Sequence, residues 1–339
     1  MKPAPELSDS EVEALLGAYA LDACEPEETA AIDAVLARRD DLAAEADLLA
    51  RAAAWLGAAQ ALRAPERLRS ATLTAAVLRR TAPVDPVVDL YLSEAEHFAA
   101  VLDSLPPGAL REVTANGLTA RDLVVHVAAQ ESLLAQLVGR PTVPSVVETD
   151  IDARTDAMLT EFEGRSIDDV VVAWRAAVEA NRGWALEHRD ETTLWRGIEL
   201  SRHDAIVVRA FETWVHADDL RRVGNLATQA PEPRHLALMT DLAGRSLGLS
   251  LALVGRERRG RTARLVLTGD GGGNWLVAMG GGTSNRDNAT VDVTVTADAV
   301  DWCRLVGDRL TPDEIVVDVH GDRALADDLL AAAPALASL

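Results

Sequence analysis

The chain has 339 residues, of which 48% are hydrophobic and 26% are charged, so it can form a folded core and is not a disordered polyanion. Its formal net charge of -21 disfavours phosphate backbones and anionic lipid surfaces, and we expect no direct binding of nucleic acid or membranes. Cys24 and Cys303 match no Cys-x-x-Cys spacing, which gives no support for a cysteine zinc site or a disulfide scaffold. Because the acidic start and the later stretches lack an export signal or a membrane span, we expect a cytoplasmic protein.

The N-terminal part of the chain consists mainly of helix-forming residues and predicts a small helical domain over residues 1–82. We expect three helices there, over residues 11–23, 27–39 and 41–63. Ser10 followed by Glu13 predicts a capping box at the start of the first helix, and Pro65 predicts a further helical stretch.

Pro83 and Pro86 mark a domain boundary, because each removes a backbone donor and disfavours helix in the residue before it. Helical spacing of apolar residues resumes in four long runs, over residues 87–105, 119–139, 152–188 and 201–224. The third run is broken near Gly164. Four such runs predict a four-helix bundle over residues 86–228.

Strand and helix patterns intermix towards the C-terminus. A helix is expected over residues 235–255, and two β-rich runs on either side of Gly271 predict a hairpin. Strict alternation around Val293 predicts another strand. The later runs predict a helix, a strand and a helix over residues 297–308, 314–321 and 322–339. We therefore expect an α+β domain over residues 232–339 and a chain that is mostly α.

Two helices of the predicted bundle carry ionisable residues on faces that are otherwise apolar. Glu212 and His216 share one stripe of their helix, and their spacing of four places both side chains over adjacent turns. A helix can offer two ligands to one ion in this way. His126 occupies the apolar face of another helix, and a buried imidazole or carboxylate is costly unless it is paired or binds a metal.

This spacing leaves two interpretations open. A glutamate and a histidine four residues apart are commonly a hydrogen-bonded or salt-bridged pair, and a single histidine on an apolar face is commonly a core residue with satisfied partners. Alternatively, the three residues are ligands of one metal ion. Composition and periodicity do not decide between these interpretations.

A family resemblance favours the metal. Residues 116–129 and 209–222 resemble the two signature stretches of the mycothiol-dependent maleylpyruvate isomerase family, a branch of the DinB-like four-helix metal-binding superfamily. The resemblance implies that His126, Glu212 and His216 bind a divalent metal, usually zinc, with one coordination position open. The Gly-Trp that commonly precedes the first stretch in the family is Gly-Leu here.

The C-terminal part supports the same family. Residues 306–330 resemble the sterol-carrier-like domain that follows the bundle in these proteins. The resemblance implies mycothiol as a thiol cosubstrate, whose thiolate form a zinc ion stabilises at neutral pH. It therefore implies an isomerase or a thiol transferase that acts on a small electrophilic substrate.

The N-terminal part resembles a different family. Residues 14–49 are similar to the N-terminal domain of anti-sigma factors, but the stretch 35–42 lacks the histidine and cysteines of the zinc-binding members. The resemblance implies a zinc-free version. An alternative function is therefore a transcriptional regulator that binds a sigma factor through this domain and senses metal or thiol through the bundle.

The remaining histidines and tryptophans carry weaker indications. His97 either approaches the predicted metal site or is an ordinary surface or core histidine. His188, His203 and His235 adjoin charged or loop residues, and we expect them to be solvated. The tryptophans are expected to fill cores, with Trp214 also a candidate wall of the site.

Overall fold

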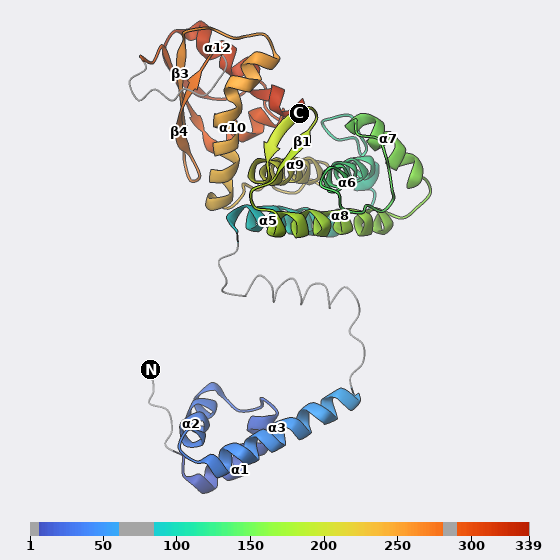
Figure 1. The fold of residues 1–339 in the computed structure, drawn as a ribbon, viewed down its shortest axis with the longest axis vertical. Helices are drawn as coiled ribbons and strands as arrows, with labels where there is room; N and C mark the ends of the chain where they lie inside the picture. Colours follow the sequence, from blue (N-terminus) through green and yellow to red (C-terminus); the bar gives the residue numbers. More distant parts are fainter. Residues whose placement is uncertain (1–6, 61–84, 281–289, 339) are drawn as a thin grey trace. The chain divides into compact units, whose positions relative to one another are not determined.

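The computed structural model describes residues 7–60, 85–280 and 290–338 of the chain (Figure 1). The protein divides into two compact units, Met1–Ala82 and Pro83–Leu339, and each contains a hydrophobic core of its own. The predicted boundary near residue 230 lies within the second unit. The division into three domains therefore stays a prediction.

The first unit contains the three predicted helices, α1 (Asp9–Ala20), α2 (Pro26–Leu36) and α3 (Asp40–Gln60). Its small core consists of six buried apolar residues, Val12, Leu16, Ile32, Val35, Leu42 and Ala46. The predicted capping box is wrong by two residues: Ser8 is the N-cap of α1, and its backbone N–H donates to Glu11 at 2.8 Å. The helical stretch predicted from Pro65 lies outside the described residues.

The second unit begins with the predicted bundle, which is confirmed as a set of long packed helices. These helices are α5 (Pro86–Ser104), α6 (Ala120–Leu137), α7 (Ile151–Glu161), α8 (Ile167–Glu187) and α9 (Arg202–Val223). The break expected near Gly164 separates α7 from α8, and Gly164 takes a left-handed φ of 71° there. Helix α6 packs against α7, α8 and α9, so its buried face lies at the centre of the bundle.

A short hairpin that the sequence did not predict lies between α8 and α9. It consists of β1 (Thr192–Trp195) and β2 (Ile198–Ser201), which pair antiparallel. Arg196 and Gly197 form the two-residue turn with φ values of 48° and 83°, as a type I′ hairpin turn requires at both positions. The hairpin contacts α6 and α9, which places Trp195 beside the helices that carry the predicted ligands.

The rest of the second unit is the α+β part, which confirms the predicted class. Its helices are α10 (Pro233–Leu253), α11 (Ala299–Val306) and α12 (Arg323–Ala332), followed by the 3₁₀ helix η2 (Ala333–Ser338). Its strands β3 (Thr262–Thr268), β4 (Gly273–Ala278), β5 (Val293–Asp298) and β6 (Val317–Gly321) form one sheet in the order β4-β3-β5-β6. Strands β3 and β5 are parallel, and the outer pairs are antiparallel.

Helix α10 packs closely against the sheet and joins the α+β part to the bundle. A Cβ at Gly244 would lie 2.5 Å from the Trp275 ring on β4, so only glycine permits this approach. Within the described residues α10 is long and apolar enough to cross a membrane, unlike our expectation, and 56% of its apolar window is buried in the protein. His235 on α10 is 1% exposed and lies 3.1 Å from Asp89 on α5, so its predicted solvation is wrong.

Candidate functional site

Helix α9 presents a row of polar side chains on a buried face. Arg209, Glu212, His216 and Asp219 follow one another at spacings of three and four residues, which keeps them on one side of the helix. The start of α9 is fixed by Ser201, whose hydroxyl accepts from the Asp204 backbone N–H at 3.0 Å. The row therefore lies along a rigid helix at a defined rotation.

His126 on α6 is held in one tautomer by its neighbours. The Thr155 hydroxyl donates to the Ile151 carbonyl at 2.7 Å, so its oxygen accepts from Nδ1–H of His126 at 3.0 Å. Nε2 of His126 is then the acceptor for the Gln130 amide at 3.0 Å, and the Gln130 oxygen accepts from Arg209 at 2.7 Å. The network therefore leaves the lone pair of His126 on Nε2.

The charge state of His126 follows from its surroundings. Burial lowers the pKa of His126 to about 3, and the positive charge of His216 acts in the same direction. His126 is therefore a neutral imidazole at physiological pH. A neutral imidazole with its lone pair on Nε2 is a form in which histidine binds a metal.

His216 is oriented through its Nδ1, which faces a carboxylate of the same helix. Its Nδ1 lies 3.2 Å from Oδ2 of Asp219, and both oxygens of Asp219 accept from Arg309 at 2.7 and 2.6 Å. Nδ1 is thereby the donor, and Nε2 points to Glu212, whose Oε2 lies 3.5 Å away. Nε2 is buried and has no hydrogen-bond partner within residues 7–60, 85–280 and 290–338.

The electrostatics around His216 favour positive charge. Burial alone would lower the pKa of His216, but the hydrogen bond to Asp219 and the nearby carboxylate of Glu212 outweigh it and raise the pKa. Burial works against the charged forms of both carboxylates as well, and their contacts with His216 nevertheless lower the pKa of Glu212 and of Asp219. Two carboxylates therefore face one imidazole, and a proton or a metal ion can neutralise part of their negative charge.

The structure brings the three predicted ligands together. The rings of His126 and His216 lie 5.4 Å apart between centroids and are perpendicular, and Glu212 lies beside His216. Within the described part of the chain, no group of three or more His, Cys, Asp or Glu side chains is arranged so that it could hold a metal ion. Metal binding by His126, Glu212 and His216 therefore stays a prediction.

A second buried network, which the sequence analysis missed, supports the site from behind. Arg209 donates to Glu131 at 3.1 Å, and the two side chains are 1% and 0% exposed. Glu131 also accepts from the Tyr91 hydroxyl and, at 2.8 Å, from the Asn181 amide. Polar residues at core positions of α6 and α8 were the signal that could have revealed it. Because Arg209 also holds Gln130, this network fixes the partner of His126 Nε2.

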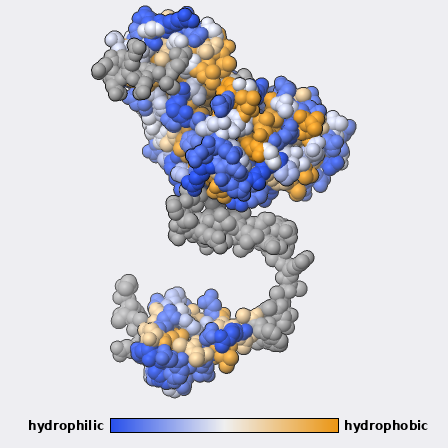
Figure 2. Space-filling view, viewed as in Figure 1, coloured by the Kyte–Doolittle hydropathy of each residue, from blue (hydrophilic) through white to orange (hydrophobic). Residues whose placement is uncertain are grey.

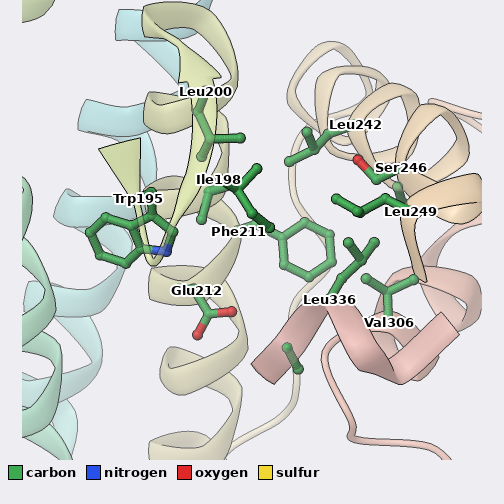
Figure 3. A pocket seen from close by; sticks show the side chains of 13 residues that line it. Trp195, Ile198, Leu200, Phe211, Glu212, Leu242, Ser246, Leu249, Val306 and Leu336 are labelled. Atoms are coloured by element: carbon green, nitrogen blue, oxygen red, sulfur yellow. The ribbon is translucent and has the colours of Figure 1, made fainter. Parts of the chain in front are cut away.

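An apolar cavity opens beside Glu212 (Figure 3). Its interior has a volume of about 70 Å³, and it is open to solvent on one side. Trp195, Ile198 and Leu200 of the hairpin form one wall, and Phe211 of α9 points into the middle towards α10. The carboxylate of Glu212 lies at one end, below Trp195. The cavity therefore gives a molecule from outside access to one of the predicted ligands.

The other candidate residues have different places. His97 lies 3.4 Å from the buried Glu94. Trp214 is buried, and its Nε1 donates to the Gln229 carbonyl at 2.8 Å, whereas Trp195 lines the cavity instead. Of the two interpretations of His97, the contact with Glu94 fits an ordinary partly buried histidine, and Trp214 is not among the residues that line the cavity.

The sequence Gly-x-Ser-x-Gly, which also marks the nucleophile elbow of hydrolases, occurs around Ser246. It lies inside α10, whereas a nucleophile elbow needs a sharp strand-to-helix turn that exposes the serine. The motif therefore gives no support for a serine nucleophile.

Comparisons with known proteins point to one family. Two solved structures, of the mycothiol-dependent maleylpyruvate isomerase and of a histidine-to-alanine mutant of it, are each 14% identical to the chain with a TM-score of 0.49, and the likeness covers 70% of this chain and 93% of theirs. A search of the curated proteins finds no match. The family model of the mycothiol maleylpyruvate isomerase N-terminal domain matches residues 91–221.

The matched segment includes His126, Glu212 and His216 and most of the bundle. It does not include residues 14–49 or 306–330, so their resemblances to anti-sigma factors and to sterol-carrier domains stay predictions. Over residues 91–221 the chain is similar to the family of mycothiol maleylpyruvate isomerase N-terminal domains.

Proposed function

We propose that the protein is a cytoplasmic, metal-dependent enzyme that uses mycothiol to isomerise, or to transfer the thiol to, a small electrophilic substrate. The proposal assigns a divalent metal, preferably zinc, to His126, Glu212 and His216. One observation carries it: the buried Nε2 of His216 finds no hydrogen-bond partner among the described residues and points to Glu212, beside the neutral ring of His126.

The donor set is suited to the metal. Two imidazoles and one carboxylate are the ligands of one class of catalytic zinc site, which keeps a further position open. Asp219 behind His216 and Thr155 behind His126 orient the two rings, as the acceptors that bond to the other ring nitrogen of histidine ligands do in zinc enzymes. When bound, the metal would stabilise the thiolate form of mycothiol at neutral pH.

The residues of the chain would then bind and shield the reactants. Trp195 and Phe211 exclude water from the side of Glu212 that faces the cavity. In the reaction, the thiolate sulfur forms a bond to the electrophilic carbon of a conjugated C=C, and the π pair moves to the adjacent carbonyl oxygen as an enolate. Rotation about the resulting single bond and loss of the thiolate give the isomer, whereas protonation of the enolate carbon completes a thiol transfer.

Metal analysis tests the ligand assignment. The protein purified without chelator is expected to contain zinc, and His216→Ala is expected to lose it. His203→Ala, on the partly exposed first turn of the same helix, is the matched control and is expected to retain the metal. Equal zinc content in all three proteins would remove His216 from the site and with it the metal proposal.

A thiol assay tests the reaction. Mycothiol and other thiols are each assayed together with a panel of conjugated electrophiles. Turnover is expected only with mycothiol as the thiol and only in the wild-type protein. Absence of turnover across the panel, in a protein that retains zinc, would overturn the proposal of an enzyme.

We keep the anti-sigma regulator as a second candidate because of the first unit. Residues 1–82 form a compact unit with its own apolar core, which catalysis at a site built from the second unit does not need. In this alternative the first unit binds a sigma factor, and the bundle responds to metal or thiol. A pull-down with purified sigma factors tests it, and failure to capture any of them would remove it.

A further inference from the structure

The two predicted imidazole ligands differ in what their Nε2 atoms contact. Nε2 of His216 is buried without a hydrogen-bond partner in the described part of the chain and points to Glu212, 3.5 Å away. Nε2 of His126, by contrast, lies 3.0 Å from the side-chain nitrogen of Gln130. An unprotonated imidazole nitrogen carries a single lone pair, which cannot serve an N–H donor and a metal ion at the same time. The site therefore contains one imidazole that is open and one that already accepts a hydrogen bond.

The orientation of the Gln130 amide is fixed by Arg209. The Arg209 guanidinium donates to the side-chain oxygen of Gln130 at 2.7 Å. Because a guanidinium has no acceptor, the amide nitrogen must be the atom that faces His126. Arg209 is held in turn by Glu131, to which its Nε donates at 3.1 Å. The amide is therefore a preformed donor to His126, and a buried ion pair holds it in place.

Burial shields this hydrogen bond from water. Gln130 and Arg209 are 8% and 1% exposed. The ring of Trp195, which also lines the cavity, has its centre 5.5 Å from the guanidinium carbon of Arg209. In Figure 2, hydrophobic residues reach the surface of the second unit where α10 and the hairpin lie next to each other. Water therefore has little access to the amide, and a hydrogen bond in such surroundings is stronger than the same bond in water.

Building on the proposed function, we infer that Gln130 competes with the metal for His126 and lowers the metal affinity of the site. Binding of an ion to His126 requires that the amide leave Nε2, whereas His216 has no such bond to break. The contact with Arg209 keeps the displaced amide close, so the hydrogen bond re-forms when the ion leaves. Gln130 thus acts against the metal, although it touches a ligand as an orienting residue would.

Zinc affinity tests the sign of this effect. Competition with a chromophoric chelator, with zinc alone as the probe, measures the affinity of the full chain. Gln130→Leu removes the amide and is expected to bind zinc roughly threefold to tenfold more tightly than the wild type, as the loss of one competing hydrogen bond implies. A glutamine that only orients His126 would give the opposite sign, because its loss would weaken metal binding. Equal or weaker zinc binding in Gln130→Leu would overturn the inference.

Gln136→Leu is the matched control. Gln136 lies on the same helix, and its side-chain oxygen also accepts from a buried arginine, Arg154, at 2.9 Å, but its amide nitrogen faces a backbone carbonyl. Its zinc affinity is expected to equal that of the wild type. Should circular dichroism show that Gln130→Leu does not fold, Gln130→Asn takes its place. Its side chain is one methylene shorter and cannot keep the bonds to both Arg209 and His126, so the same increase in zinc affinity is expected.

A nuclear magnetic resonance measurement without zinc separates this inference from the proposed function. The nitrogen resonance of His126 Nε2 in chelator-treated protein reports whether this atom accepts a hydrogen bond. It is expected to shift in Gln130→Leu and not in Gln136→Leu, and an unshifted resonance would show that the amide does not bond to Nε2. If the resonance shifts but neither the wild type nor Gln130→Leu binds zinc, the proposed function is wrong and Gln130 has no metal to compete with. If the wild type binds zinc and Gln130→Leu binds it no more tightly, the inferred competition is wrong and the proposed metal site stands.

Discussion

Arg309 and Asp219 form a two-point ion pair between the α+β part and the bundle. Nε of Arg309 lies 2.7 Å from Oδ1 of Asp219, and a terminal nitrogen lies 2.6 Å from Oδ2. Asp219 in turn orients His216. Because Arg309 follows α11 and Asp219 belongs to α9, the C-terminal part of the chain controls the orientation of a predicted ligand in the bundle.

Arg309→Lys is expected to weaken zinc binding. Lysine keeps the charge but cannot hold both oxygens of Asp219, so His216 loses its fixed orientation. Loss of a contact that orients a metal ligand costs roughly 10- to 100-fold in metal affinity, and competition with a chromophoric chelator measures this affinity. Arg323→Lys, on a side chain that is 67% exposed, is the control. Equal zinc affinities in both variants would show that Asp219 orients His216 without the two-point ion pair to Arg309.

Thr155→Val is expected to affect both stability and metal binding. Valine has nearly the shape of threonine but leaves Nδ1–H of His126 without an acceptor, and such a buried donor costs about 1–3 kcal/mol in the free energy of unfolding. The tautomer that keeps the lone pair on Nε2 is also no longer enforced, so zinc affinity falls. Urea unfolding and chelator competition measure the two effects.

Thr213→Val is the matched control for this prediction. Thr213 is 2% exposed and donates to the Arg209 carbonyl in its own helix, so its loss leaves no ring nitrogen without a partner. We expect its zinc affinity to equal that of the wild type. If Thr155→Val also retained full zinc affinity, the hydroxyl would have no role in presenting His126.

Local spacing made Glu212 and His216 candidate ligands, and the family resemblance implied the metal, but neither indicated the residues that support them. The four-residue spacing of Glu212 and His216 on one helix needs no tertiary information. Arg309 and Asp219, by contrast, are 90 residues apart, and their contact depends on how the α+β part packs against α9. The same limit hid the pair of Arg209 and Glu131, whose helices meet only in the folded bundle.

Short elements were harder to predict than long ones. The hairpin strands β1 and β2 have four residues each, too few for a periodic signal, and Arg196 takes the left-handed position where Asn or Gly is usual. At the N-terminus both Ser8 and Ser10 are followed three residues later by glutamate. The helix begins after Ser8, the N-cap that the sequence pattern alone could not select.

Glu131→Gln is expected to destabilise the second unit strongly. The change removes the charge that faces Arg209 in a site where both side chains are almost fully buried, and breaking a buried pair on one side costs about 3 kcal/mol or more. Urea unfolding, monitored by tryptophan fluorescence, measures the loss in the free energy of unfolding. Glu179→Gln breaks the pair with Arg182 at a position that is 64% exposed, and its expected cost is below about 1 kcal/mol. Similar losses in the two variants would contradict a special role for the buried network.

The pair of His97 and Glu94 is expected to make stability depend on pH. The hydrogen bond to Glu94 raises the pKa of His97, and burial opposes this only in part. The contribution of the charged pair is therefore fully present below the unfolded-state pKa of about 6.5 and is lost as the pH rises through the higher folded-state value. His97→Gln should lower the free energy of unfolding at about pH 5.5 by more than at about pH 9, where the ring is neutral in both states. In a Glu94→Gln background this difference should disappear. Equal losses in the free energy of unfolding at both pH values in the wild-type background would instead assign the effect to packing of the ring and not to its charge.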